Sequence, residues 1–237
     1  VYLSWPIEPG RLPAFVDAAR LLNIRGCSIT IPHKIDIIPL LDKTSENVRE
    51  MGACNTLYRD GEKICGENTD VIGFTAPLRK RSLPPETRVL VLGAGGVSRA
   101  AIAGLRRLGL ANITLTNRRK ERAEALCNEF GLLCAPWEER GDVPADLIIN
   151  TTPLGMTGAQ EHETPYPWAF QDNGIAYDLI YTPFQTRFLR DAAAAGWETV
   201  SGLDMFIGQG DAQFHLWTGH HLPEEAITAV TSALYGQ

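Results

Sequence analysis

One stretch indicates the fold of a large part of this chain: Val89-Leu90-Val91-Leu92-Gly93-Ala94-Gly95-Gly96-Val97-Ser98-Arg99-Ala100. Four consecutive apolar residues are typical of a strand that is buried on both faces, and a glycine turn follows them directly. Gly93 permits the tight turn, and Gly95 lets backbone N–H groups approach a pyrophosphate. The helix expected from about Val97 adds a partial positive charge at the same point. The stretch therefore predicts a dinucleotide-binding turn, with Ser98 at the third glycine position; a purely structural glycine turn is the alternative.

The segments that follow alternate between strands and helices. We expect strands over residues 88–92, 112–116, 146–150 and 174–180, and helices over 97–108 and 120–130. This alternation implies parallel strands joined by right-handed crossovers, so we predict a Rossmann-like domain over residues 79–204.

The residues after the second of these strands decide the cofactor. An NAD site usually has an acidic residue about 20 residues past the first glycine, where it holds the ribose 2′-hydroxyl. This chain has Asn117-Arg118-Arg119-Lys120-Glu121-Arg122 instead. Guanidinium groups bind phosphate oxygens bidentately, and a basic run at a helix N-terminus is otherwise electrostatically disfavoured. The run predicts a site for the 2′-phosphate of NADP, with a solvated helical turn as the alternative.

The first third of the chain predicts a separate αβ unit, residues 1–78. Its expected elements are helices over 11–22 and 46–51, a strand over 27–32 that Pro32 ends, and strands over 55–59 and 63–66. The last two strands are joined through Asp60-Gly61, a pair that tolerates the positive φ of a tight turn.

Two helical patterns, over residues 205–218 and 224–235, follow the Rossmann-like domain. Their apolar faces need a partner surface, and we expect residues 205–237 to pack back on the first unit. The predicted fold class is therefore α/β: an N-terminal αβ substrate domain, a Rossmann-like nucleotide domain, and returning C-terminal helices.

Composition narrows the choice of function. The 237 residues carry a net charge of −6, which argues against nonspecific binding of nucleic acid through a basic face. No apolar run approaches the roughly 20 residues of a membrane helix. Five cysteines without a CxxC pair suggest neither a disulfide framework nor a cysteine zinc site, so we expect a reducing cytoplasm.

Two polar segments of the first unit contain side chains that could take part in catalysis. One ends a predicted strand with Lys34, and the other, residues 66–70, ends with Asp70 in a predicted loop. Brought together, Lys34 and Asp70 could form a proton-transfer pair in which the carboxylate orients the ammonium group. A surface salt bridge and an Asx turn are the alternatives.

Taken together, these motifs resemble those of the shikimate dehydrogenase family. The resembling segments occur in the family's order over nearly the whole chain: residues 29–34, 52–56, 68–70, 93–100, 117–119, 150–156, 177–181 and 208–209. The resemblance implies an NADP(H)-dependent oxidoreductase that interconverts 3-dehydroshikimate and shikimate in the biosynthesis of aromatic amino acids. It also implies small-molecule ligands only, with no metal, nucleic acid or membrane, and a monomer or homodimer.

The resemblance also implies roles for single residues. Lys34 is the expected catalytic acid/base, and Asp70 is expected to pair with it and to bind a substrate hydroxyl. The other expected substrate contacts are Thr30, Asn55, Tyr181 and Gln209. The expected cofactor contacts are Gly93, Ala94, Gly95, Gly96, Val97, Asn117, Arg118, Arg119 and Arg122, with Leu179 and Gly202 near the nicotinamide.

Departures from the family pattern keep two other functions open. Ser28 stands where the family often has Asn, which resembles the quinate/shikimate dehydrogenase branch and its use of NAD or NADP. Asp204 stands where many members have glycine. A non-catalytic, ligand-sensing homologue is the second alternative. The family begins with a strand and a Ser-x-Ser loop that binds the substrate carboxylate, and we expect such a segment ahead of Val1.

Other reactive side chains fit structural roles better. Cys54 is expected to be a small buried residue rather than a nucleophile. His220 and His221 are adjacent, so they would not share a helix face and make a poor metal site.

Overall fold

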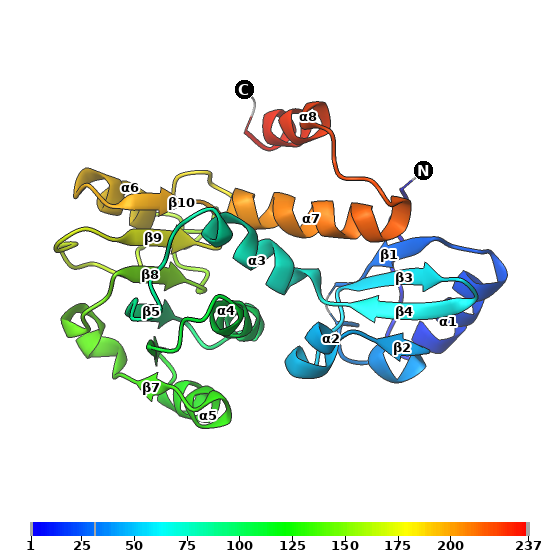
Figure 1. The fold of residues 1–237 in the computed structure, drawn as a ribbon, viewed down its shortest axis with the longest axis horizontal. Helices are drawn as coiled ribbons and strands as arrows, with labels where there is room; N and C mark the ends of the chain where they lie inside the picture. Colours follow the sequence, from blue (N-terminus) through cyan, green and yellow to red (C-terminus); the bar gives the residue numbers. More distant parts are fainter. Residues whose placement is uncertain (1, 31, 236–237) are drawn as a thin grey trace. The chain divides into compact units, whose positions relative to one another are not determined.

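The computed structural model describes residues 2–30 and 32–235, so Ile31 of the predicted Lys34 segment lies outside the described residues. The chain forms two compact units: residues 1–71 with 210–222, and residues 72–209 with 223–237. It passes from one unit to the other within helices α3 (Thr69–Arg79) and α7 (Gly202–Thr218), both labelled in Figure 1, and a third time between residues 222 and 223. The domain limits 1–78, 79–204 and 205–237 stay predictions.

The first unit contains a four-stranded mixed sheet. Its strands, in spatial order, are β1 (Gly26–Ser28), β3 (Thr56–Asp60), β4 (Lys63–Glu67) and β2 (Lys43–Thr44). β3 runs antiparallel to both β1 and β4, whereas β2 is parallel to β4. Gly61, at φ +61°, makes the tight turn predicted between β3 and β4.

Three short helical segments accompany this sheet: α1 (Leu12–Leu21), the 3-10 helix η1 (Ile38–Leu40) and α2 (Glu46–Met51). Ser45 caps α2 by accepting a hydrogen bond from the backbone of Val48, and Gly52 ends it at φ +60°. The core of the first unit is apolar and continuous between helices and sheet: Leu12, Val16, Cys27, Ile29, Ile37, Val48, Cys54, Leu57 and Ile64.

The second unit contains a six-stranded parallel sheet, which confirms the predicted Rossmann-like domain. Its strands, in spatial order, are β10 (Glu198–Val200), β9 (Ile175–Asp178), β8 (Leu147–Asn150), β5 (Val89–Leu92), β6 (Ile113–Thr116) and β7 (Leu133–Cys134). β9 ends at Asp178, two residues before the predicted end, because the Asp178 carboxylate accepts the backbone N–H of Ile180 and turns the chain.

Helices cover this sheet where the crossovers require them. α4 (Gly96–Arg107) follows the glycine turn; α5 (Lys120–Phe130) packs against β6 and β7, and α6 (Arg187–Ala194) against β9 and β10. A 3-10 helix, η2 (Trp137–Asp142), precedes β8. One core cluster of this unit combines residues from strands, from α6 and from loops: Leu90, Leu92, Ile148, Tyr166, Ala176, Phe188, Leu189, Ala192 and Trp197.

Helix α3 corrects one expectation from the sequence. Asp70 was predicted to lie in a loop, but it occupies the first turn of α3. Its backbone N–H donates a hydrogen bond to Asn68 Oδ1 at 3.1 Å. The helix was hidden in the sequence because Pro77 lies inside it and because its apolar residues show little preference for one face. Asp70 is therefore held by a helix start rather than by a flexible turn.

The two C-terminal helices differ in what they pack against. On α7, the Trp217 indole N–H donates to the Leu57 carbonyl at 2.9 Å, so this part packs on β3 as expected. Helix α8 (Glu224–Tyr235) departs from the expectation and groups with the second unit. The aromatic contact between Tyr235 and Phe184, at a centroid distance of 5.2 Å, accounts for that placement.

Candidate active site

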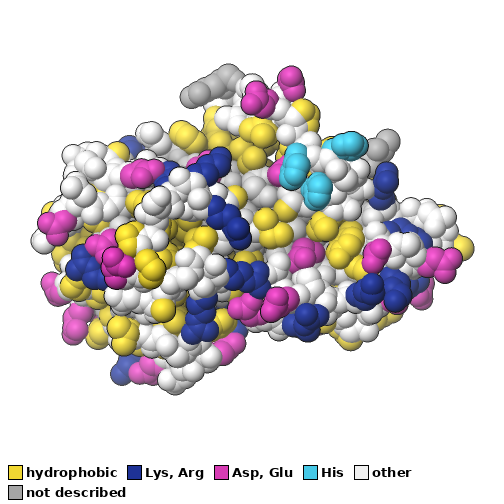
Figure 2. All heavy atoms as spheres, in the orientation of Figure 1, with side chains coloured by type: hydrophobic (Ala, Val, Ile, Leu, Met, Phe, Trp, Pro, Cys, Tyr) yellow, Lys and Arg dark blue, Asp and Glu magenta, His cyan; other side chains and the backbone are white. Residues whose placement is uncertain are grey.

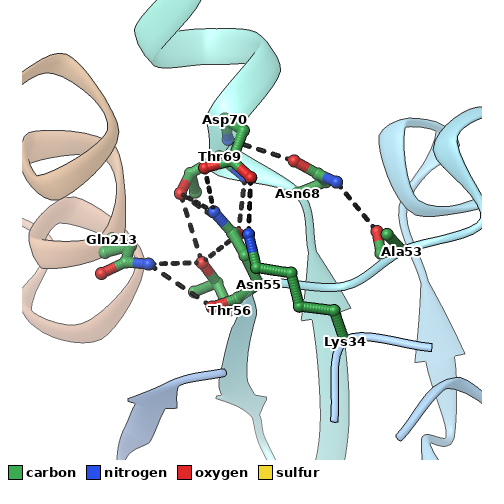
Figure 3. Close-up of polar contacts among 8 residues, drawn as sticks. All are labelled: Lys34, Ala53, Asn55, Thr56, Asn68, Thr69, Asp70 and Gln213. Atoms are coloured by element: carbon green, nitrogen blue, oxygen red, sulfur yellow. Dashed lines mark hydrogen bonds and ion pairs between the residues drawn. The ribbon is translucent and has the colours of Figure 1, made fainter. Parts of the chain in front are cut away.

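Lys34 and Asp70 form an ion pair in the first unit. The Lys34 Nζ atom lies 2.9 Å from Asp70 Oδ2, and the two side chains are 31% and 22% exposed (Figure 3). The Lys34 carbonyl accepts a hydrogen bond from the Cys54 N–H, which fixes the backbone beneath the ammonium group. The pair is thus ordered by its surroundings but still accessible to a small molecule.

Asn55 holds the other oxygen of Asp70. Its Nδ2 donates to Asp70 Oδ1 at 2.9 Å, and its own Oδ1 accepts the Thr69 N–H at 2.8 Å and the Thr56 hydroxyl at 2.7 Å. Asn55 is 3% exposed, so these bonds are shielded from water. Both carboxylate oxygens of Asp70 therefore have partners, and its orientation toward Lys34 is fixed.

Gln213, which the sequence analysis did not single out, joins this network from α7. Its Nε2 donates to the Thr56 hydroxyl at 3.0 Å, and its Oε1 accepts the Ser28 hydroxyl at 2.7 Å (Figure 3 shows the first contact). Gln213 stands one helical turn after Gln209, and that spacing is the sequence signal that could have found it. Through Gln213, the candidate specificity position Ser28 connects to the residues that hold Asp70.

The remaining predicted substrate residues lie elsewhere. Thr30 follows β1 and is exposed. Tyr181 and Gln209 belong to the second unit, where both contact Phe206: the Tyr181 ring stacks on it at 4.8 Å, and Gln209 Nε2 donates to its carbonyl at 3.1 Å. Hydrogen bonds thus connect Asn55, Asp70 and Lys34 directly, and Tyr181 and Gln209 form a second small group.

A cavity of about 260 Å³ lies at the glycine turn of the second unit. Its lining contains most of the predicted cofactor residues: Gly93, Ala94, Gly95, Asn117, Arg118, Arg119 and Arg122. Gly96 and Val97 begin α4 beside it. The cavity lies at the carboxyl ends of β5 and β6, and parallel sheets bind nucleotides at these ends.

The glycines of this turn are required for different reasons. Gly93 has φ +115°, and a Cβ there would lie 2.4 Å from the Thr151 hydroxyl oxygen. At Gly95 a Cβ would meet nothing within 4 Å, so its backbone borders open space. Ser98, at the third position of the motif, accepts the Gly95 N–H at 2.9 Å and lies 2.7 Å from the Thr151 hydroxyl. Ser98 thus links the helix to the neighbouring strand end.

The donors around the cavity fit a phosphorylated dinucleotide. Three guanidinium groups, from Arg118, Arg119 and Arg122, line it, and none of its described lining residues is acidic. Asn117 fixes the turn that carries them by donating to the Arg119 carbonyl at 2.8 Å. Together with the N–H groups that the first turn of α4 leaves without helical partners, this set suits a pyrophosphate and a 2′-phosphate.

Other lining residues were not predicted as cofactor contacts. Residues 151–154, Trp137 and Gln160 also border the cavity. Residues 151–154 follow β8 directly, so their position after a predicted central strand was a usable signal. Nothing local in the sequence marks Trp137 or Gln160, because η2 and the long loop after β8 bring them there.

Leu179 and Gly202, predicted to lie near the nicotinamide, are neighbours. The Leu179 N–H donates to the Asn150 carbonyl at 3.0 Å, continuing the β8–β9 pairing by one residue. A Cβ at Gly202 would lie 2.5 Å from the Leu179 carbonyl oxygen and from Ile180, so only glycine fits at the start of α7.

The remaining reactive side chains have structural surroundings. Cys54 is fully buried, and burial raises the pKa of its thiol to about 11, so it stays protonated near neutral pH. The His215 and His221 rings stack at 4.6 Å, and His221 Nδ1 lies 2.8 Å from Asp211 Oδ2. Figure 2 shows a group of histidine side chains, in cyan, on the face that it draws. Among the described residues, no group of three or more potential ligands could hold a metal.

None of the helices in the described part of the chain is both long and apolar enough to cross a bilayer.

A parallel sheet with a glycine turn and a basic cavity, in a chain that also carries an accessible Lys–Asp pair, defines a nucleotide-dependent α/β oxidoreductase. Comparison with known families is more specific. Residues 1–57 match the shikimate dehydrogenase substrate binding domain, residues 78–139 the shikimate / quinate 5-dehydrogenase family, and residues 202–230 the shikimate 5′-dehydrogenase C-terminal domain.

Individual relatives agree with the family models. The chain is 56% identical over 239 residues to a protein of Pelobacter propionicus named shikimate dehydrogenase (NADP(+)), covering 99% of this chain and 86% of the relative. The chain therefore belongs to the shikimate dehydrogenase family, as its motifs predicted.

Solved structures show the same fold. Shikimate 5-dehydrogenase of Thermus thermophilus, in complex with NADP(H) and shikimate, is 35% identical with a TM-score of 0.83, covering 97% of this chain and 86% of that one. Quinate dehydrogenase of Corynebacterium glutamicum, in complex with NAD, is 30% identical with a TM-score of 0.87, covering 98% and 86%.

Proposed function

We propose that this chain catalyses the NADP-dependent interconversion of shikimate and 3-dehydroshikimate. The observation that carries the proposal is the partly exposed Lys34–Asp70 pair at 2.9 Å, in a chain that also has a nucleotide cavity lined by three arginines. Proton transfer at the substrate oxygen needs the Lys34–Asp70 pair, and preference for a 2′-phosphate needs the three arginines. The name of the Pelobacter relative fits both.

Lys34 handles the proton at the reacting oxygen. As the substrate carbonyl is reduced, its oxygen gains negative charge, and the Lys34 ammonium group donates a proton to it. In the reverse direction, neutral Lys34 accepts the proton of the hydroxyl group. NADPH, when bound, supplies the hydride. Asp70 accepts hydrogen bonds from Lys34 and Asn55, so it orients the ammonium group and leaves Nζ accessible.

The substrate's other hydroxyl groups require fixed polar partners. We assign Asp70 and Asn55 to one of them, because Thr69 and Thr56 hold the Asn55 side chain and Asn55 in turn holds Asp70. Thr30, Tyr181 and Gln209 remain the other proposed substrate contacts. A preorganised network of this kind binds without a large ordering cost.

The cofactor assignments follow the lining of the cavity. Residues 93–97 receive the pyrophosphate, because glycine leaves the backbone uncovered and the helix start supplies N–H groups. Arg118, Arg119 and Arg122, with Asn117, receive the 2′-phosphate. We place the nicotinamide beside Leu179 and Gly202.

The setting of the reaction is part of the proposal. All five cysteines are free, and four of them are buried, which suits a reducing cytoplasm. A monomer or homodimer is the expected assembly.

A four-way assay of the full chain tests the function. Reduction of NADP⁺ and of NAD⁺ is measured with shikimate and, separately, with quinate. We expect the highest kcat/KM with shikimate and NADP⁺. Turnover of neither acid with either cofactor, by a folded protein that binds NADP⁺, would contradict the proposal and favour a ligand-sensing homologue.

The second candidate function is that of a quinate/shikimate dehydrogenase. Two observations favour keeping it: Ser28 is hydrogen-bonded to Gln213 within the Asp70 network, and a quinate dehydrogenase is among the similar structures. In the same assay, comparable kcat/KM values for quinate and shikimate would select this function. The intact Lys34–Asp70 pair counts against the non-catalytic alternative.

A further inference from the structure

Two buried polar side chains belong to the last residues of two adjacent strands in the second unit. Asn150, the last residue of β8, pairs in register with Asp178, the last residue of β9, and both are 0% exposed. The Asn150 Nδ2 donates to Asp178 Oδ1 at 3.0 Å. Neither residue lines the cavity, so neither was assigned a role above.

Asp178 receives donors from three different places. Thr186 Oγ1 donates to its Oδ2 at 2.6 Å, while the Ile180 N–H and Asn150 Nδ2 each donate to its Oδ1 at 3.0 Å. None of the ion pairs between described residues includes Asp178, so these hydrogen bonds alone satisfy its buried oxygens. Burial raises the pKa of Asp178 to about 7. The three hydrogen bonds therefore fix the orientation of this buried side chain.

Asn150 shapes the loop that borders the cavity. Its Oδ1 accepts both the N–H and the hydroxyl of Thr152, at 2.9 and 2.7 Å, and its Nδ2 also donates to the Leu154 carbonyl at 3.2 Å. Thr152 and Leu154 both line the cavity. The conformation of this loop therefore depends directly on the Asn150 side chain.

Asp178 shapes the next loop in the same way. Its bond to the Ile180 N–H turns the chain directly after Leu179, and its bond to Thr186 fixes the start of α6, because Thr186 also caps that helix through the Leu189 N–H. The two loops are tied again further out, where the Thr157 N–H donates to the Thr182 carbonyl at 3.0 Å.

We propose that Asn150 and Asp178 act as one positioning pair, which fixes the cavity loop 151–154 relative to the loop 179–182 and so sets the geometry of the bound cofactor. The inference rests on the proposed function only in placing Leu179 near the nicotinamide. Neither residue lines the cavity, and each acts through the loop residues that its side chain holds.

Three variants of the full chain test the pair. In D178A, Ile180 N–H, Asn150 Nδ2 and the Thr186 hydroxyl lose their buried acceptor, so both loops are released. D178N keeps the shape of the side chain: its oxygen can accept from Ile180 and Asn150, and its amide can donate to the Thr186 oxygen, since a hydroxyl also accepts. T87V is the matched control, because it removes a buried hydroxyl of the same unit that bonds the Pro84 carbonyl at 2.6 Å.

The readouts are the Kd for NADP⁺ by calorimetry, kcat and KM for shikimate, and Tm. We expect D178A to bind NADP⁺ at least about fivefold more weakly and to lose at least about tenfold in kcat, since small misplacements of reacting groups have effects of this size. D178N should restore both quantities to within about threefold, which a purely structural loss would not predict. T87V should lower Tm without changing Kd or kcat.

Two results would overturn the positioning pair. One is an unchanged Kd and kcat in folded D178A; the other is equal losses in T87V at a similar fall in Tm. Where D178A does not fold, T186A carries the same test, because it removes a single donor, and unchanged Kd and kcat in T186A would equally contradict the pair. Binding of NADP⁺ does not depend on the substrate, so a wild type without turnover would disprove the proposed function and leave this comparison decisive.

Discussion

The nucleotide cavity and the Lys34–Asp70 cluster are built in different ways. Strand β5, the glycine turn and the basic run, all within residues 89–122, supply most of the cavity. The cluster takes its side chains from separate segments, and Lys34 and Asp70 are 36 residues apart. Local backbone conformation shapes the glycine turn of the first site, whereas side-chain hydrogen bonds between distant segments hold the second. Changes to the glycines and arginines that line the cavity should therefore alter cofactor binding, and changes in the cluster should alter the chemical step.

Replacing Lys34 should give the largest effect. K34A removes the proton donor, so we expect kcat to fall by about 10²–10⁴-fold while the Kd for NADP⁺ stays the same. Steady-state kinetics and calorimetry measure the two quantities. K43A is the matched control, because Lys43 forms an exposed ion pair with Asp60 at 3.3 Å and should be nearly silent. A K34A enzyme with wild-type kcat would refute the assignment.

Charge reversal in the cavity should change cofactor choice. R118D replaces a phosphate-binding guanidinium by a carboxylate, which can instead accept the 2′-hydroxyl of NAD. We expect the KM for NADP⁺ to rise by at least about tenfold and the KM for NAD⁺ to change little. K80D makes the same change of charge at an exposed residue outside the cavity lining and should leave both KM values unaltered. Equal effects of R118D on both cofactors would contradict a 2′-phosphate role.

Substitution of the two glycines of the turn should affect different quantities, stability at Gly93 and cofactor binding at Gly95. A Cβ at Gly93 meets the Thr151 hydroxyl in a backbone conformation with φ +115°, so G93A should lower Tm by several degrees. A Cβ at Gly95 meets only open space, so G95A should keep Tm and raise the KM for NADP⁺. Thermal melts and kinetics distinguish the two. The assignment of open space at Gly95 to the cofactor would be wrong if G95A bound NADP⁺ like the wild type.

The smallest effect concerns pH and stability. The pKa of Asp178 is raised from 3.8 to about 7, so between these values the folded state keeps a proton that the unfolded chain has released. Wild-type stability should therefore decrease as pH rises through this window. D178N lacks the titration, so its Tm relative to wild type should improve from pH 4 to pH 7. A constant difference in Tm over that range would show that Asp178 does not titrate there.

Much of the second unit could be predicted because its signals are local. The apolar run 89–92, the glycine turn and the helix over 120–130 each depend on neighbours in sequence, and the structure places them where the pattern indicates. The basic run 117–122 predicts a phosphate site from the charges of its own side chains, whatever the rest of the fold. Short edge strands such as β7 and β10 were missed, because two or three residues leave no periodicity.

The chemistry of the first unit could be recognised by resemblance but not assembled from periodicity. Lys34 and Asp70 could be singled out as residue types, and the family motifs suggested that they pair. The helix start at Asp70 and the joining of Gln213 to the network required packing of distant segments. No local pattern encodes such contacts.

The residues alone were sufficient to identify the family, the nucleotide turn and the candidate proton donor, since each is written in a short contiguous motif whose conformation and charge follow from its own side chains. Folding in three dimensions was needed for the orientation of Asp70 by Asn55, the lining of the cavity by Trp137, and the buried Asn150–Asp178 pair. The physical reason is that a buried hydrogen bond forms only where packing excludes water and brings donor and acceptor into line.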